Sequence, residues 1–269
     1  MFQVRTKIVY NKRVKNNYFA LALKAPRIVR RAQPGQFVQI KVNAGFQPLL
    51  RRPFGIHSVK GKRIEVLYEV LGPGTQILSQ KKPGDFLDII GPLGNGFNYR
   101  LAVSGSRLAV LVSGGMGIAP LVFLAEKLIY RKPQTANRKP LVLIGAKTKS
   151  QILCEKEFKR LGCDVKISTD DGSLGFRGKI TDLLKKLLRN NELTKQRVND
   201  STIYACGPRP MLKEVSAVAK KYNIPAQLSL EEHMVCGIGA CLGCTVNTRE
   251  GYQRACKEGP VFNAQEIIW

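Results

Sequence analysis

The stretch LVSGGMGIAP, residues 111–120, decides the fold that the sequence predicts. It joins an apolar run at residues 107–112 to a helical pattern at residues 119–130 through a turn rich in glycine. The uncharged run at residues 108–125 approaches the length of a membrane span, but three glycines and a proline lie inside it. We therefore interpret the stretch as a buried strand, a glycine loop and the start of a helix, and we expect no membrane span.

The alternation of strand and helix continues along the middle of the chain. Apolar runs predict further strands at residues 140–144, 164–168 and 202–206. Amphipathic patterns predict helices at residues 155–161, 180–188 and 209–222. Strands that alternate with helices are typical of a doubly wound parallel sheet, so this part of the chain belongs to the α/β class.

The rest of the chain shows two other sequence patterns. Up to about residue 100, turn signals such as Pro34-Gly35 and Gly91-Pro92 separate short β-rich runs, a pattern typical of an all-β barrel or sandwich. After Pro225 the chain becomes rich in cysteine and glycine. The sequence thus predicts three domains: an antiparallel β-barrel at residues 1–102, an α/β nucleotide-binding domain at 103–226 and a small cluster domain at 227–269.

The composition predicts a folded protein with a strong positive charge. Of the 269 residues, 44% are hydrophobic and 23% are charged, which excludes a disordered chain. The 44 basic residues exceed the 19 acidic ones by 25, an excess that would attract polyanions, acidic protein surfaces or anionic ligands. Basic residues interrupt the N-terminus before a secretory apolar stretch can form, so we expect a cytoplasmic location.

Four cysteines near the C-terminus carry the strongest chemical signal. Cys236, Cys241, Cys244 and Cys256 have the spacing C-x4-C-x2-C-x11-C, with glycines between the first three. This spacing is typical of a plant-type [2Fe-2S] cluster. A four-cysteine zinc site, which usually pairs two C-x2-C motifs, and a group of unrelated buried thiols are the alternatives.

Two further groups of residues suit the binding of phosphates. Gly114, Gly115 and Gly117 follow a predicted strand, where a tight turn lets backbone N–H groups approach a pyrophosphate. The pattern departs from G-x-G-x-x-G, and a plain connecting turn is the alternative. In the barrel half, the segments at residues 51–55, 67–69 and 74–75 offer guanidinium groups, aromatic rings and turn amides, with solvated charges and hairpin turns as the alternative.

The combination of these motifs resembles a known superfamily. A barrel with RPFG at residues 52–55, a nucleotide half with GGMGIAP and CGP, and a ferredoxin-like tail are similar to the ferredoxin-NADP reductase superfamily. Within it, CGIGACLGC at residues 236–244 and RACKEGPVF at residues 254–262 resemble the C-terminal motif of the electron-transfer subunits of class 1B dihydroorotate dehydrogenase. The resemblance covers nearly the whole chain, in the same order.

The resemblance implies a set of cofactor contacts. Residues that would hold FAD through its isoalloxazine and pyrophosphate are Arg52, Pro53, Phe54, Gly55, Leu67, Tyr68, Glu69, Gly74 and Thr75. Gly55 departs from the serine usual in the family, so a backbone N–H has to replace a hydroxyl, and Glu69 replaces a residue that is often basic. The glycine loop at residues 114–117 would admit the nicotinamide cofactor, and Cys206 would lie near the reactive face of the flavin.

The function implied by the resemblance is an electron relay. Dihydroorotate would be oxidised on a separate FMN-containing catalytic subunit, in a heterotetramer of two subunits of each kind. Electrons would then pass through the [2Fe-2S] cluster and FAD to NAD+ in pyrimidine biosynthesis. Asp170 and Asp171, at a predicted strand end, favour NAD over NADP because acidic groups would repel a 2′-phosphate.

The relay assigns no catalytic acid or base. His57 and His233 are expected to be hydrogen-bonded structural histidines, and Cys154 and Cys163 small buried side chains.

Two other functions stay open at this point. A related ferredoxin-NADP reductase or sulfide dehydrogenase subunit would share the barrel and the nucleotide half. A basic nucleic-acid-binding protein with a zinc module would use the charge, but the basic residues are scattered through predicted strands and helices and form no stripe interleaved with aromatic residues. We therefore expect no nucleic acid among the partners.

Overall fold

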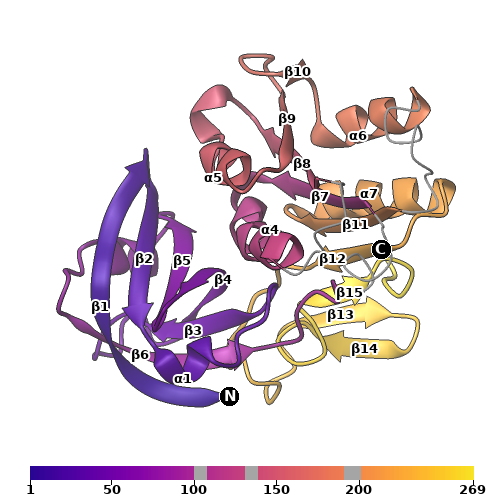
Figure 1. Ribbon diagram of the computed structural model, residues 1–269. Coiled ribbons are helices and arrows are strands. Elements are labelled where there is room, and N and C mark those ends of the chain that lie inside the picture. Colours follow the sequence, from indigo (N-terminus) through magenta and orange to yellow (C-terminus); the bar gives the residue numbers. More distant parts are fainter. Residues whose placement is uncertain (100–107, 131–138, 191–200) are drawn as a thin grey trace.

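A computed structural model of the chain places a closed β-barrel beside a seven-stranded sheet, with the C-terminal segment, yellow in Figure 1, packed near both. The structure describes residues 1–99, 108–130, 139–190 and 201–269. The predicted domain boundary after residue 102 and the predicted strand start at residue 107 lie outside the described residues. Among the helices that are described, none is both long and apolar enough to cross a membrane.

The N-terminal barrel has six antiparallel strands and closes because its first strand pairs with its last. In the order in which they neighbour one another, the strands are β1 (Phe2–Lys15), β2 (Tyr18–Lys24), β5 (Arg63–Glu69), β4 (Arg52–Lys60), β3 (Phe37–Lys41) and β6 (Phe86–Leu93). Two short helices, α1 (Pro26–Val29) and α2 (Pro73–Ser79), lie in its connections. In β2, Phe19 and Leu21 fill the interior, while Tyr18 and Ala20 join the core of the neighbouring domain. The prediction of a barrel or sandwich is therefore resolved as a barrel.

The middle of the chain forms most of the seven-stranded sheet. Its strands follow the order β10 (Phe176–Arg177), β9 (Asp164–Thr169), β8 (Leu141–Ala146), β7 (Leu108–Gly114), β11 (Ser201–Cys206), β12 (Ala226–Ser229) and β15 (Val261–Asn263). Neighbouring strands are parallel except for β12 and β15. The strand order reverses at β7, so the carboxyl ends of β7 and β11 border the kind of crevice in which doubly wound folds bind ligands.

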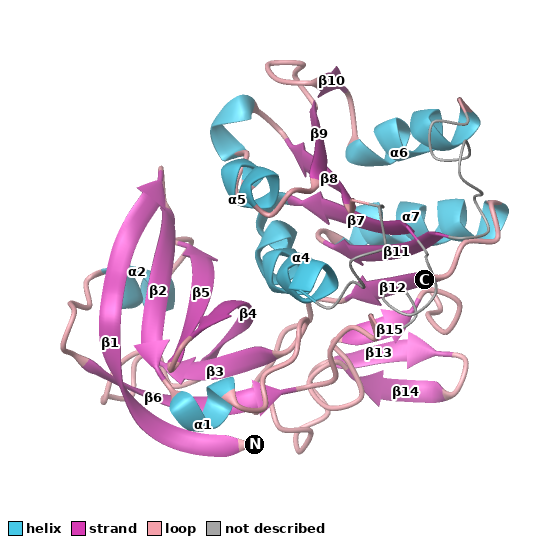
Figure 2. Ribbon diagram, in the orientation of Figure 1, coloured by secondary structure: helices cyan, strands magenta, loops and turns pink. Residues whose placement is uncertain are grey.

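Helices cover both faces of this sheet, because alternate strand residues point to opposite sides (Figure 2). On the face toward the barrel lie α4 (Ala119–Tyr130) and α5 (Glu155–Arg160), and on the other face lie α6 (Ile180–Arg189) and α7 (Arg209–Lys221). Short 3-10 turns, Gly115–Ile118 and Lys149–Gln151, follow β7 and β8. Phe123 of α4 belongs to the barrel core, which joins the two domains. The predicted strands and helices of this half are confirmed, with described ends within two residues of the prediction.

The C-terminal segment leaves the sheet after β12 and returns to it at β15. Between these strands it forms a loop at residues 235–244, here called the cysteine loop, and a hairpin of β13 (Thr245–Thr248) and β14 (Gly251–Arg254). It shares the core beneath α6 and α7 and also touches the barrel, where the Asn95 amide donates a hydrogen bond to the Gly259 oxygen at 2.6 Å. The predicted boundary after residue 226 falls inside β12, so the segment is continuous with the sheet before it.

Candidate functional site

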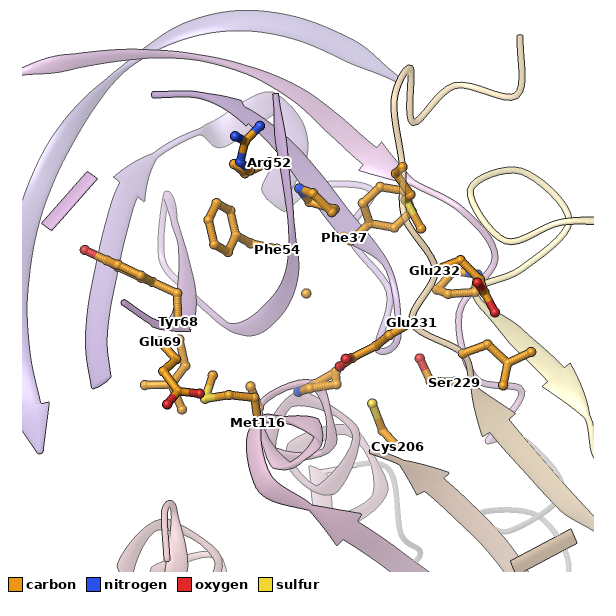
Figure 3. Close-up of a pocket in the computed structure, with 18 of the residues that line it drawn as sticks. Phe37, Arg52, Phe54, Tyr68, Glu69, Met116, Cys206, Ser229, Glu231 and Glu232 are labelled. Atoms are coloured by element: carbon orange, nitrogen blue, oxygen red, sulfur yellow. The ribbon is translucent and has the colours of Figure 1, made fainter. Parts of the chain in front are cut away.

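A pocket of about 590 Å³ lies between the barrel, the first turn of α4 and the carboxyl ends of β11 and β12. Figure 3 shows Arg52 and Phe54 on the barrel side of the opening and Cys206, Ser229 and Glu231 on the sheet side. The predicted cofactor contacts that line it are Arg52, Pro53, Phe54, Gly55, Leu67, Tyr68, Glu69, Thr75 and Cys206. Gly74, Gly114, Gly115 and Gly117 are described but lie outside its lining.

Arg52 lies against the first turn of α2. Its Nη1 donates a hydrogen bond to the Leu50 backbone oxygen at 2.7 Å. A Cβ on Gly74 would stand 2.8 Å from the Arg52 Nε, so glycine at this position leaves room for the guanidinium. The Thr75 hydroxyl accepts hydrogen bonds from two amides of the turn, at 3.0 and 3.2 Å. A guanidinium held against such a turn suits a phosphate, because its planar donors can bind two oxygens at once.

Tyr68 lines the pocket and also belongs to the barrel core. Its ring centroid lies 5.6 Å from that of Phe19 in a stacked arrangement and 5.7 Å from that of Phe54 in an edge-on one. Its hydroxyl donates to the Asn11 side-chain oxygen at 2.9 Å, and burial raises the pKa of Tyr68 to about 12. The barrel itself therefore fixes the position of this ring.

The glycine loop after β7 packs against the turn after β11. A Cβ on Gly117 would lie 2.2 Å from the Cys206 backbone oxygen, and a Cβ on Gly114 would lie 2.8 Å from the Met211 sulfur. Gly115 has a φ of +54°, and no described atom lies within 4 Å of its Cβ position. The close approach of two turns thus explains two of the three glycines, and Gly115 faces open space.

Gly55 faces the first turn of α4. A Cβ at this position would lie 3.6 Å from the Pro120 Cβ, which is ordinary van der Waals contact. The structure would therefore accommodate the serine that is usual in the superfamily, and glycine here is no requirement of packing.

The pocket residues that follow β12 were not predicted from the sequence. Burial raises the pKa of Glu231, which lines the pocket. Burial also raises the pKa of the Cys206 thiol, and the Glu231 charge adds to this effect, so the thiol stays neutral. Glu232 pairs with Arg209 at 2.7 Å. Glu231 and Glu232 follow a strand end, where ligands of open α/β sheets bind, but β12 has only four residues and is too short for the sequence to predict.

The four predicted cluster ligands lie in a segment arranged around sulfur. The amides of Ile238, Ala240 and Cys241 donate to the Cys236 Sγ at 3.5, 3.3 and 3.4 Å. Partial burial acts to raise the pKa of Cys236, but these hydrogen bonds outweigh it and lower the pKa to about 6. Cys241 is exposed, whereas Cys244 and Cys256 are buried. The segment therefore stabilises a thiolate at Cys236, which is the form that binds a metal.

The surroundings of the cysteine loop fit an iron-sulfur cluster. Gly237 and Gly239 have φ angles of +69° and +86°, and a Cβ on Gly237 would lie 2.3 Å from the Gln39 Nε2. Gln39 of β3 is fully buried, and neither polar atom of its side chain has a hydrogen-bond partner among the described residues. Buried amides are normally paired, and sulfur atoms of a cluster in this loop would supply an acceptor for the Gln39 amide.

The cysteine positions favour two irons over a single zinc ion. Four sulfurs bound to one zinc ion, each about 2.3 Å from it, would all lie about 3.8 Å from one another. Among the described residues, the group of metal-binding side chains whose ligand atoms all lie within 4.8 Å of one another contains none of the four cysteines. A [2Fe-2S] cluster binds two cysteines on each iron and so spreads the four sulfurs farther apart.

Two family models and several curated relatives match the chain. Residues 231–268 match the iron-sulfur cluster binding domain of dihydroorotate dehydrogenase B, and residues 111–217 match the oxidoreductase NAD-binding domain. The whole chain aligns at 42% identity with the electron transfer subunit of dihydroorotate dehydrogenase B (NAD(+)) of Desulforamulus reducens, covering 98% of that protein. The chain belongs to this family of electron transfer subunits. The corresponding subunit of Bacillus caldolyticus is 38% identical over 98% of each chain.

The chain is also similar to solved reductase structures. A chain of the NADH-dependent reduced ferredoxin-NADP oxidoreductase, described as a flavin-based electron-bifurcating enzyme, has a TM-score of 0.81 at 31% identity, covering 98% of this chain and 90% of that one. A ferredoxin-NADP+ reductase from Neisseria gonorrhoeae, solved with FAD and NADP, has a TM-score of 0.68 at 18% identity, covering 82% and 91%. The predicted barrel and nucleotide-binding architecture is thereby confirmed as a fold.

Proposed function

We propose that the chain is the electron-transfer subunit of an NAD+-linked dihydroorotate dehydrogenase. It would hold FAD in the pocket and a [2Fe-2S] cluster on Cys236, Cys241, Cys244 and Cys256. The position of β3 carries the proposal: Phe37 lines the pocket, and Gln39, two residues along the strand, packs against Gly237 of the cysteine loop. Two residues of a strand span about 6.6 Å. A flavin in the pocket and a cluster on the loop would therefore be close neighbours.

The chemistry explains why both groups are needed. A flavin exchanges a hydride with nicotinamide and single electrons with a [2Fe-2S] cluster. Dihydroorotate gives up two electrons and two protons when it becomes orotate, and NAD+ takes up both electrons with one proton. The residues of the chain would bind the two cofactors and hold them apart. The neutral Cys206 thiol and Glu231 border the pocket at the strand ends.

The proposal includes a set of cofactor contacts in and beside the pocket. We assign the flavin ring to Pro53, Phe54, Gly55, Leu67, Tyr68 and Glu69, its pyrophosphate to Arg52, Gly74 and Thr75, and the nicotinamide dinucleotide to Gly114, Gly115 and Gly117 next to Cys206. The contact between Arg52 and the Gly74 turn supports the phosphate assignment. The open space at Gly115 supports the dinucleotide assignment, and the acidic pair Asp170 and Asp171 favours NAD over NADP.

The cysteine loop would also form the partner interface. Val235, Ile238 and Leu242 have exposed fractions of 47%, 45% and 60%, and they lie among the cysteines. Exposed apolar side chains of this kind are common at protein interfaces. We propose that an FMN-containing catalytic subunit covers them, in a heterotetramer of two subunits of each kind.

The organisation and location follow from the same proposal. The chain would comprise a FAD-binding barrel at residues 1–102, an NAD-binding domain at 103–226 and a cluster domain at 227–269, the last tied to the sheet by β12 and β15. Seven free thiols suit the reducing conditions of the cytoplasm, where we place the complex.

Co-purification tests the proposal. The chain is expressed with an FMN-containing dihydroorotate dehydrogenase subunit, and the complex is expected to contain FAD and two irons per electron-transfer chain. It should reduce NAD+ with dihydroorotate, whereas neither subunit should do so alone. A complex without NAD+ reduction, or a catalytic subunit that reduces NAD+ unaided, would contradict the proposal.

A related reductase is the second candidate function. The high TM-score of the bifurcating ferredoxin-NADP oxidoreductase chain, over nearly the full length of both proteins, favours it. Reduction of NADP+ by reduced ferredoxin, without any response to dihydroorotate, would establish this alternative.

A further inference from the structure

A second pocket, of about 480 Å³, lies where β4 and β5 of the barrel meet α5 of the sheet domain. His57, Glu65, Cys154 and Glu157 are among the residues that line it. Among the described residues, it shares only Leu67 with the lining of the cofactor pocket. The proposed electron relay uses none of the four named side chains.

His57 is held so that one ring nitrogen faces this pocket. Its side chain is 2% exposed, and Nδ1 lies 2.9 Å from the Ala119 backbone oxygen. A carbonyl oxygen can only accept, so Nδ1 carries a proton, and Nε2 is the ring nitrogen that faces the pocket side chains. Nε2 lies 3.1 Å from a Glu157 oxygen and 3.6 Å from a Glu65 oxygen. Metal-binding histidines typically donate their other N–H to a carbonyl in this way.

Cys154 adds a sulfur ligand to the same place. It directly precedes α5 and has a left-handed backbone, with a φ of +59°. Its sulfur, a ring nitrogen of His57 and a carboxylate oxygen of Glu157 all lie within 4.8 Å of one another. The prediction that His57 is a hydrogen-bonded histidine is confirmed. A structural histidine needs only hydrogen-bond partners, however, and here a thiol lies beside it as well.

The charges around the imidazole do not explain the thiol. Glu65, Glu157 and Glu126 gather here, although the chain has only 19 acidic residues against 44 basic ones, and Glu126 is close enough for the His57 and Glu157 charges to affect its pKa. Lys60 and Arg160 face Glu157 and offset part of the negative charge. An ion-pair cluster would need the carboxylates and the bases, whereas a thiol beside an imidazole nitrogen and a carboxylate is typical of a metal site.

We propose that His57, Cys154 and Glu157 bind one Zn²⁺ ion, with Glu65 as the fourth ligand. Imidazole nitrogen, thiolate and carboxylate are the ligands that Zn²⁺ takes in proteins, and four protein ligands make a structural site. Cys154 releases its proton to solvent as its sulfur binds. The ion ties β4 and β5 of the barrel to α5, and so fixes the two domains that share the cofactor pocket.

His57, Cys154 and Glu157 need only small movements to bind one ion. Bonds of about 2.0 to 2.3 Å in a tetrahedron place neighbouring ligand atoms about 3.3 to 3.8 Å apart. The His57 nitrogen and the Glu157 oxygen are already 3.1 Å apart, and the Glu157 side chain is 41% exposed and can turn.

Zinc binding to the loaded protein tests the proposal. Protein with full flavin and iron content is stripped of loosely bound metal by dialysis against a weak chelator, mixed with equimolar ZnCl2 and passed through a gel filtration column. We expect one zinc ion per chain by elemental analysis and a rise in Tm of roughly 5 °C at saturating zinc. His57→Gln and Cys154→Ser should each weaken zinc affinity at least about 100-fold and abolish the rise in Tm.

Glu155→Gln is the matched control, because Glu155 lies on the same helix but pairs with Lys159 at 2.7 Å. This variant should bind zinc like the wild type. The proposal is overturned if the loaded wild type retains no zinc, or if Cys154→Ser binds it unchanged, in which case His57 and Glu157 form only an ion pair. Cys154→Ser changes a single atom, so it keeps the test decisive even if His57→Gln does not fold. Zinc binding does not depend on the electron relay, and the two proposals can fail separately.

Discussion

The cofactor pocket and the cysteine loop use their residues in opposite ways. In the pocket, side chains have partners within the protein: Tyr68 packs between aromatic rings, and the Thr75 hydroxyl accepts two backbone amides. In the cysteine loop, three amides converge on the Cys236 sulfur, and the buried amide of Gln39 has no partner among the described residues. The polar groups named in the pocket are thus satisfied by the protein itself, whereas the cysteine loop is arranged around atoms that a bound group would supply.

This difference shows where folding depends on the bound group. The barrel and the sheet have apolar cores of their own, so they can form without a ligand. The segment between β12 and β15 shares the core of the sheet, and we expect metal binding to fix its cysteine loop. Loss of the cluster should therefore leave the flavin site intact.

The largest expected effect is the loss of iron on changing one buried cysteine. Cys244→Ser should remove nearly all cluster iron, because a serine hydroxyl is a poor ligand for iron, while FAD per chain stays close to the wild-type value. Iron analysis and flavin absorbance measure both quantities. Cys163→Ser, a buried cysteine outside the loop, should change neither. Simultaneous loss of iron and FAD would show that the two regions fold as one.

Next in size is the effect of Arg52 on flavin affinity. Arg52→Ala removes charge-assisted hydrogen bonds to the pyrophosphate and should weaken FAD binding about tenfold to a hundredfold, with iron content unchanged. Fluorescence titration of the flavin-free protein gives the dissociation constant. Arg51→Ala is the control, because Arg51 pairs with Asp88 at 3.0 Å outside the pocket lining. Equal losses in the two variants would reject the assignment of Arg52.

A similar but smaller loss is expected at the partner interface. Ile238→Glu places a charge among the exposed apolar residues of the loop and should weaken binding of the catalytic subunit about tenfold, without loss of iron. Binding is measured by surface plasmon resonance with the loaded protein. Tyr130→Glu, at an 81% exposed position at the end of α4, should bind normally. If it instead weakens binding as much as Ile238→Glu, the interface lies elsewhere.

Gln39 should affect the cluster without affecting its assembly. Hydrogen bonds to sulfur stabilise the reduced cluster, which carries more negative charge, so Gln39→Leu should shift the reduction potential to more negative values. Redox titration followed by electron paramagnetic resonance measures the shift. An unchanged potential at full iron content would mean that the Gln39 amide does not reach the cluster.

The smallest effect concerns an ion pair outside the pocket lining and the cysteine loop. Glu214 accepts hydrogen bonds from Lys185 and from the Thr181 hydroxyl, and these lower its pKa from 4.5. The stability from this carboxylate is present above pH 4.5 and is lost as the pH falls through the lowered pKa. Glu214→Gln should cost about 0.5 to 1 kcal/mol at pH 7. Urea unfolding should show a smaller difference at pH 4, and a constant difference would exclude titration of Glu214.

The sequence predicted the parallel sheet well because its signals are local. The helix from Ala119 to Tyr130 is an apolar run that begins directly after a glycine turn, and its ends are as predicted. By contrast, β12 has four residues and β15 three, too few for a periodic pattern. Their pairing depends on contacts across more than thirty residues of chain, which no local signal reports.

In the candidate site too, residues with a local sequence signal were predicted and residues placed by distant contacts were not. The spacing of the four cysteines predicted the cluster, and the resemblance predicted the barrel side of the pocket. Glu231 and Met116 were missed because their place in the pocket follows from how the barrel meets the sheet. Gln39 gives no signal either, since a glutamine in a strand normally faces water, and here the cysteine loop buries it.

The antiparallel pairing of β15 with β12 fastens the iron-binding segment at its beginning and its end. Because both of its ends are paired in the sheet, the segment cannot move as a rigid body on a flexible linker, as a tethered carrier domain does. The distance between the cluster and the flavin is therefore set when the protein folds. No domain movement has to precede electron transfer in a turnover.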